Sequence, residues 1–380
     1  MNRIALKMLI GDRAKYVGLI FGIMFATLLM SQQMSIFVGI LSRTASQIRD
    51  IPEAAIWVMD PRVQFVDEVE PLPDTAVGRV RGVPGVEWAV PLYKGQAIAR
   101  AADGLLQQVI LMGLDDATLT GAPRKMLLGD LKNLREPDAL IMDSAGFRHI
   151  WPDEELSLGK VIELNERRAK IVGICESAPP FMTAPVVFTR YSLAAQYVPQ
   201  KRNQLSFVLV RPEQGANEDA LCSAIEAQTG LVALRSQQFI WKTLSYYLRR
   251  TGIPINFGIT ILLGFIVGAA ITGQTFFLFI VDNMRQFGAL KAIGVSNGRI
   301  LMMVLLQAAV VGLIGYGIGI GLAALFFETT NAKVPNLRGI RLLWQVMMIA
   351  FGAMTVIITL VSVISIRRVL VTDPAEVFRG

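Results

Sequence analysis

The chain has 380 residues, of which 53% are hydrophobic, and its formal net charge is +7. Its mean hydropathy of +0.48 argues against a simple soluble enzyme, although the length has room for two or three ordinary domains. A basic chain can bind nucleic acid, but no arginine-rich tail or zinc-knuckle spacing supports that function here. Because many lysines and arginines flank apolar segments, we expect them to anchor membrane spans on the cytoplasmic side.

The sequence contains little material for catalysis. The two cysteines, Cys175 and Cys222, form no metal motif, and there is a single histidine, His149. An oxidising compartment would allow the cysteines to pair, and the sequence leaves this open. The chain lacks G-x-x-x-x-G-K-[ST], H-E-x-x-H and G-x-S-x-G, so it carries no ATP-binding P-loop and no recognisable catalytic set. We predict no catalytic residue and no metal site.

The N-terminal part begins with a basic segment followed by an apolar one. Residues 1–15 interleave basic and apolar side chains, which is typical of an amphipathic helix on an anionic membrane face. A simple positive flank for the next span explains the pattern equally well. Residues 16–41 form the first predicted span, too long for the apolar core of a signal peptide, and we interpret them as an uncleaved signal anchor.

Residues 42–252 resemble ordinary globular sequence and predict an inserted α+β domain. Its β-rich runs are residues 55–59, 87–99, 108–114, 139–142, 161–164, 169–175, 185–189 and 205–210. Helical patterns lie between them at residues 75–80, 144–150, 190–197 and 217–229, the last with Asn217 as N-cap and Gly230 as its end. Residues 236–250 are aromatic and basic, and predict a helix that leads through the membrane interface into the second span.

Three further spans follow the inserted domain. They cover residues 254–281, 300–325 and 342–366, with a short outer loop at residues 328–341 and a tail at residues 367–380. The second and third spans contain no charged residue and many glycines. Glycines one turn apart let helices approach closely, so we predict that these pairs pack helices together. The pairs are Gly264 and Gly268, Gly315 and Gly319, and Gly317 and Gly321.

Four spans place both termini on the same side of the membrane. Four basic residues precede the first span and fewer follow it, which favours cytoplasmic termini and an extracytoplasmic inserted domain. The charge bias is weak at the other spans, because basic residues also lie near their outer ends. The fold class predicted from sequence is therefore a four-span α-helical membrane protein with a large extracytoplasmic α+β insertion.

The charged insert at residues 282–299 joins the second span to the third. Its apolar residues recur every three positions and form one stripe of a short helix, while Arg285 and Lys291 lie off that stripe. Gly294 can end the helix in a left-handed conformation. Such a helix either lies on the lipid surface or docks on a cytosolic partner, and spacing alone leaves both open. The stripe consists of Met284, Phe287, Leu290 and Ile293.

The run RQFGALKAIGVSNGRI in this insert resembles the hallmark loop of FtsX-like permeases, the MacB-type class of ABC transporter. The tail, with its paired arginines and Asp373-Pro374-Ala375-Glu376, is similar to the usual ending of that family, and the order of spans and insertion also matches. The stretch from Tyr247 to Gly321 resembles the DevC branch most closely. That branch consists of permease subunits associated with export of heterocyst glycolipids in cyanobacteria.

The resemblance implies a mechanotransmission exporter. The inserted domain would be periplasmic and carry porter and Sabre lobes, and stalk helices would pass motion from the inner membrane to a membrane-fusion adaptor and a TolC-like outer-membrane channel. The permease would act as a homodimer with separate ABC ATPase subunits that bind ATP and Mg, so this chain would bind no cofactor itself. The helix from Met284 to Ile293 would be the coupling helix. The resemblance assigns the role of coupling to the ATPase to Arg285, Phe287, Gly288, Leu290, Lys291 and Gly294.

The leading hypothesis is thus the permease subunit of a MacB-type (type VII) exporter of a glycolipid or other amphiphile. One alternative is an FtsX-like signalling subunit that activates a periplasmic cell-wall hydrolase, although such proteins usually have a smaller outer domain. Another is a Lol-type permease that releases lipoproteins. Membrane lipids are expected partners in each case, and nucleic acid in none.

Overall fold

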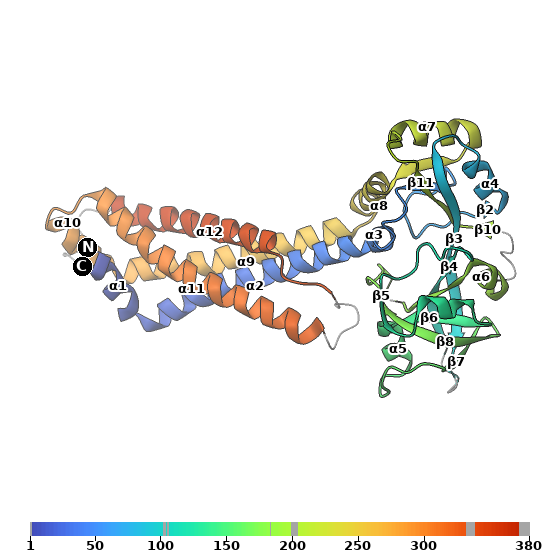
Figure 1. Cartoon of the computed structure of the whole chain (residues 1–380). Helices are drawn as coiled ribbons and strands as arrows, with labels where there is room; N and C mark the ends of the chain where they lie inside the picture. The colour runs from blue at the N-terminus through green and yellow to red at the C-terminus, as the bar shows by residue number, and fades with distance from the viewer. Residues whose placement is uncertain are drawn as a thin grey trace. The chain divides into compact units, whose positions relative to one another are not determined.

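The computed structural model describes residues 2–101, 104, 106–182, 184–198, 204–331 and 339–371. The chain divides into a helical unit, residues 1–39 and 252–380, and an inserted domain, residues 40–251. Figure 1 shows the long helices of the first unit and the mixed sheet of the second. The paired arginines and the acidic motif of the tail lie outside the side chains that the structure describes.

Among the described residues, four helices are long and apolar enough to cross a membrane. Three predicted spans lie wholly within α2, α9 and α11, and α12 begins at Trp344, slightly later than predicted. Charged residues are confined to the ends of these helices, which is why each is continuous over its apolar stretch. The helices of this unit are α1 (Asn2–Gly11), α2 (Arg13–Thr44), α9 (Ile253–Asp282), α10 (Met284–Ala292), α11 (Asn297–Asn331) and α12 (Trp344–Val371).

The long helices bury one side against each other and leave large apolar side chains exposed on the other. Their shared core contains Leu19, Phe276, Val304 and Ile358, contributed by four different helices. Leucines and isoleucines such as Leu262 remain exposed. In water this exposure would be unfavourable, whereas a lipid environment accepts it, so the burial pattern is that of membrane-spanning helices.

The inserted domain is built on a sheet of ten strands in the described residues, in the order β12-β1-β11-β3-β4-β9-β6-β8-β5, with β7 paired to β3 and β8. All eight β-rich runs predicted from sequence are strands, and β5 and β12 are additional. The strands are β1 (Ile56–Met59), β3 (Val86–Arg100), β4 (Leu106–Leu114), β5 (Lys125–Leu128), β6 (Ala139–Asp143), β7 (Val161–Leu164), β8 (Arg167–Glu176), β9 (Val186–Arg190), β11 (Phe207–Pro212) and β12 (Val232–Arg235). A separate pair is formed by β2 (Leu72–Pro73) and β10 (Gln204–Leu205).

The strand β3 joins two lobes. Its first half pairs with β11, where Leu92 lies opposite Phe207, and its second half pairs with β4, where Tyr93 lies opposite Gly113. Helices α4 and α7 cover the first lobe, and α5 and α6 cover the second. The helices of the inserted domain are α3 (Ser46–Arg49), α4 (Thr75–Arg81), η1 (Leu131–Arg135), α5 (Ser144–Ile150), α6 (Tyr191–Tyr197), α7 (Glu218–Thr229) and α8 (Ser236–Arg250).

Alternation along the strands separates the cores of the domain. In β1, Trp57 belongs to one core while its neighbours Ile56 and Val58 belong to another, as a period of two requires. The face with Trp57 is continuous across both lobes and is covered by α3 and α8, which contribute Ile48 and Phe239. This core therefore binds the two helices that flank the inserted domain in sequence to both of its lobes.

Candidate functional site

The helix α10 occupies the charged insert between α9 and α11, as predicted. It ends in a Schellman motif, in which Val295 N donates to Leu290 O at 3.1 Å and Gly294 N donates to Lys291 O at 3.0 Å. Gly294 has φ = +93°, a conformation that glycine adopts without strain. The predicted stop at Gly294 is confirmed, and the chain reverses there so that α11 can begin at Asn297.

The apolar stripe of α10 does not form one exposed face. Phe287 is fully buried in the core of the helical unit, and Gly288 is also buried. Met284, Leu290 and Lys291 are half-buried, whereas Arg285 and Gly294 are exposed, and Ile293 is 81% exposed. Phe287 therefore anchors α10 to its own chain, while Arg285 and Ile293 remain on the accessible surface.

An ion-pair network lies next to α10. Lys15 at the start of α2 pairs with Asp12 at 2.7 Å and also with Asp282, the last residue of α9. One lysine thus joins the segment before α2 to the end of α9, at the point where α10 begins. No local pattern of residues marks this pairing, because Lys15 and Asp282 are far apart in the chain.

The predicted packing glycines fall into two groups. A Cβ added at Gly264 would lie 3.4 Å from Leu29 Cβ, and one at Gly268 would collide with Ala26, so both pack on α2. Gly315 and Gly319 also pack on α2, since added Cβ atoms would lie 2.9 Å from Ile23 Cβ and 2.7 Å from Met24 O. Around Gly317 and Gly321, no described atom lies within 4 Å of an added Cβ. The first four glycines therefore let α9 and α11 approach α2, and the last two have no such role within the described chain.

Two close contacts outside these motifs also depend on glycine. An added Cβ at Gly22 would lie 2.9 Å from the Thr272 hydroxyl, and one at Gly312 would collide with Ile358. Neither glycine belongs to the predicted pairs, and no spacing signal in the sequence marks them. They show that α12, as well as α2, is held at close range through a small residue.

In the inserted domain, a buried charge network contacts α8. Lys94 of β3 is buried and pairs with Asp67, and its ammonium also donates to Val66 O at 2.9 Å. The hydroxyl of Tyr247 on α8 donates to the other carboxylate oxygen of Asp67 at 3.4 Å. Burial lowers the pKa of Lys94 and raises that of Tyr247. The network connects α8 to β3 two residues beyond Leu92, where the strand changes partners.

Aromatic rings surround this network. Phe65 stacks on Tyr246 with ring centroids 4.2 Å apart and meets Tyr247 edge-on, and Phe181 packs on Tyr247 with ring centroids 4.7 Å apart. The aromatic residues of residues 236–250 were predicted to lie in the headgroup zone. In the structure, Tyr246 and Tyr247 pack within the inserted domain and Trp241 is exposed, and their place relative to the membrane stays a prediction.

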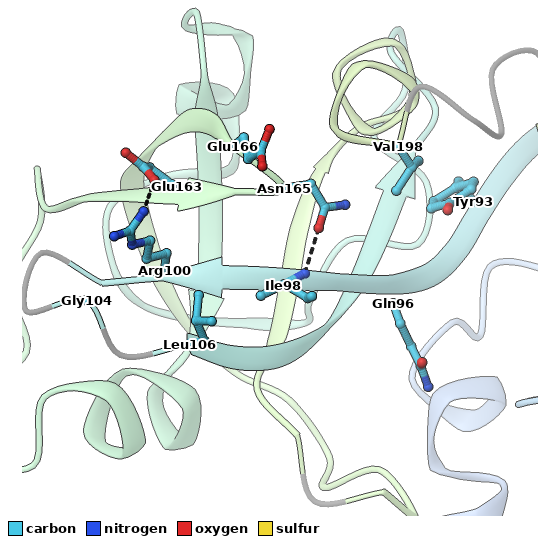
Figure 2. Close-up of a pocket in the computed structure, with 10 residues that line it drawn as sticks. All are labelled: Tyr93, Gln96, Ile98, Arg100, Gly104, Leu106, Glu163, Asn165, Glu166 and Val198. Atoms are coloured by element: carbon cyan, nitrogen blue, oxygen red, sulfur yellow. Dashed lines mark hydrogen bonds and ion pairs between the residues drawn. The ribbon is translucent and has the colours of Figure 1, made fainter.

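A cavity of about 870 Å³ lies beside β3 in the second lobe (Figure 2). Asn165 closes one side, accepting a hydrogen bond from Ile98 N at 2.9 Å and donating to Tyr197 O at 3.0 Å. Its φ of +45° belongs to the tight turn between β7 and β8, where asparagine is favoured. Arg100 and Glu163 pair at 3.8 Å, and Ile98 and Leu106 are exposed. The walls therefore mix apolar groups with amides and one ion pair.

The two cysteines are free and are buried in different cores of the inserted domain. Cys175 lies in the core that contains Trp57, and Cys222 lies in the core of the first lobe. Burial raises the pKa of both thiols, that of Cys222 to about 11. Among the described residues, no three His, Cys, Asp or Glu side chains gather as a metal site.

The fold defines a class: four apolar helices, a mixed α+β domain inserted after the first, and a short helix between the second and third are the layout of a membrane permease. Residues 17–228 match the MacB-like periplasmic core domain, and residues 258–374 match the FtsX-like permease C-terminal domain. The chain belongs to this family of ABC transporter permeases, as its hallmark loop predicted.

Several named proteins are similar to this chain. The chain is 26% identical, over 313 residues, to an uncharacterized ABC transporter permease of Mycobacterium tuberculosis, covering 82% of this chain and 80% of the relative. It is 22% identical over 255 residues to the macrolide export ATP-binding/permease protein MacB of Escherichia coli K12, covering 62% of this chain and 37% of that protein. The crystal structure of the periplasmic region of MacB from Actinobacillus actinomycetemcomitans aligns with a TM-score of 0.39 at 14% identity, over 52% of this chain and 95% of that one.

Proposed function

We propose that this chain is the membrane-spanning subunit of a MacB-type (type VII) exporter, in which a separate ABC ATPase hydrolyses ATP and this permease transmits the resulting motion. The observation that carries the proposal is the construction of α10. Phe287 anchors the helix in the core of the helical unit, while Arg285 and Ile293 remain free to meet a cytosolic surface. A docked subunit that pushes on α10 would therefore push on the spans themselves.

The inserted domain supports transmission toward the periplasm. α8 continues in sequence into α9 through Thr251 and Gly252, so movement of the span would act on the C-terminal end of the inserted domain. Within the domain, the Lys94–Asp67–Tyr247 network connects α8 to β3, and the core that contains Trp57 packs α8 against both lobes. Force applied to α8 would thus reach both lobes, and a membrane-fusion adaptor and TolC-like channel would receive it.

We further propose that two copies of the permease work together and that the cargo is an amphiphile, such as a glycolipid of the kind handled by the DevC branch. The orientation has cytoplasmic termini and a periplasmic inserted domain. In support, the cavity beside β3 combines exposed apolar side chains with amide groups, which suits an amphiphile better than a small ion. ATP and Mg would bind the ATPase partner.

The test is purification of the tagged full chain in mild detergent, followed by identification of its partners. Recovery of an ABC ATPase with a periplasmic adaptor supports the exporter. Recovery of the ATPase with a cell-wall hydrolase would identify the FtsX-like signalling function instead, and a lipoprotein carrier would identify the Lol-type function. Absence of any ATPase across several detergents would overturn the coupling role of α10.

A further inference from the structure

A second cavity, of about 610 Å³, lies in the helical unit between α1 and α10. Lys7 and Gly11 of α1 line one side, and Asn283 and Gln286 line the other. Arg13, the first residue of α2, also lines the cavity. The cavity is separate from the glycine contacts of the spans, and its walls are formed by the two short helices at one end of the bundle.

The charge of this cavity is positive. Lys7 and Arg13 are exposed, and neither forms an ion pair with another described residue. The single acid in the lining is Asp12, and its carboxylate is already paired with Lys15 at 2.7 Å. Two basic groups are therefore available to an anion, and the third, Lys15, is shared by the carboxylates of Asp12 and Asp282, so the basic groups here outnumber the acids by one.

An apolar ridge leads away from the cavity along α2. Arg13, Val17, Phe21 and Phe25 follow at intervals of four residues and so share one face of the helix. Val17 is 62% exposed and Phe21 is 54% exposed, and the rings of Phe21 and Phe25 are stacked with centroids 6.2 Å apart. The face thus begins with a cation at the end of the span and continues as an apolar surface into it.

We propose that this cavity binds the headgroup of an anionic phospholipid, with its phosphate at Lys7 and Arg13 and its acyl chains along Val17 and Phe21. Both parts of such a lipid have a complementary surface here: the cationic pocket at the end of the span suits the phosphate, and the apolar ridge suits the acyl chains. Since Gln286 belongs to α10, a bound headgroup contacts both α1 and α10. The lipid then holds α10 in place. Its effect on coupling rests on the function proposed above, whereas its binding does not.

The binding test compares the full-length permease with Arg13→Gln and with the matched control Arg299→Gln, in native mass spectrometry with phosphatidylglycerol and phosphatidylcholine. Arg299 is an exposed arginine close to the start of another span, outside the cavity. We expect wild type and Arg299→Gln to retain phosphatidylglycerol in preference to phosphatidylcholine. Loss of one charge-assisted contact should weaken this binding about tenfold in Arg13→Gln.

Equal retention by Arg13→Gln and wild type would overturn the proposal, and so would equal loss in both variants, which indicates only general surface charge. Soluble glycerol phosphate provides a second arm. If it displaces the lipid at equal concentration, the site recognises free phosphate and the acyl ridge has no role.

The contact with α10 is tested by hydrogen exchange in nanodiscs, which needs no ATPase. Phosphatidylglycerol should protect the amides of α10 relative to phosphatidylcholine in wild type and in Arg299→Gln, but not in Arg13→Gln. Protection that is independent of lipid in all three proteins would contradict the bridge between α1 and α10.

Discussion

The ammonium of Lys94 on β3 forms a buried ion pair with the carboxylate of Asp67, which also accepts a hydrogen bond from Tyr247 on α8. Removing a charge from water costs desolvation free energy, and each of these two charges offsets that cost through its attraction to the other. The pair ties the helix that precedes the second span to the strand that crosses from one lobe to the other.

Asp67→Asn should destabilise the inserted domain by about 3–5 kcal/mol, because it leaves the Lys94 ammonium buried without a counter-charge. The double variant Lys94→Met/Asp67→Leu removes both charges and should restore most of that loss. Unfolding of the full chain in detergent, followed by the fluorescence of the buried Trp57, gives the comparison. If the single variant unfolds like wild type, the pair has no energetic role.

Asp50 should make the stability of the inserted domain depend on pH. Burial raises the pKa of its carboxyl, although Ala178 N donates to it at 3.1 Å. A raised folded-state pKa means that the protonated form favours folding below the ordinary value of 3.8, and that this contribution is lost as pH rises through the folded pKa. Asparagine does not titrate, so the unfolding temperature of Asp50→Asn minus that of wild type should increase as the pH rises from 4 to 7. A constant difference across this range would contradict the assignment.

Two apolar residues, Phe287 within α10 and Ile293 just beyond its end, should separate stability from partner binding. Phe287→Ala empties a buried site and should lower the stability of the helical unit by about 3–5 kcal/mol. Ile293→Asp changes an exposed residue and should leave the unfolding temperature unchanged while reducing recovery of the ATPase in pull-down. Normal ATPase recovery by Ile293→Asp would remove this residue from the docking surface.

Gly268 and Gly321 provide a test position and a matched control position for helix packing. Gly268→Ala places a methyl group against Ala26 of α2 and should cost about 1–3 kcal/mol through overpacking. Gly321→Ala meets no described atom and should be neutral in the same thermal unfolding assay. Equal behaviour of the two variants would show that the α2–α9 contact tolerates expansion.

Orientation can be measured with Ala117→Cys in the inserted domain and Ala292→Cys in α10, both of which replace exposed residues. The native cysteines are buried and should remain unlabelled in the folded protein. Residue 117 should react with a membrane-impermeant thiol reagent in spheroplasts, and residue 292 only after the inner membrane is opened. The reverse pattern would place the inserted domain in the cytoplasm.

The local features of this protein follow from its sequence. Apolar runs of the right length predicted the four long helices, alternation predicted the main strands, and Gly294 predicted the end of α10, because each depends on residues close together in the chain. The family was likewise recognisable from one short loop and the order of segments.

Tertiary structure decided which of these residues face inward and which face outward. Phe287 and Ile293 look alike in the stripe of α10, but only the packed helical unit buries the first and exposes the second. Lys94 and Asp67, or Lys15 and Asp282, become partners only when distant segments meet. Such contacts depend on how whole elements pack, and no local pattern of residues records that arrangement.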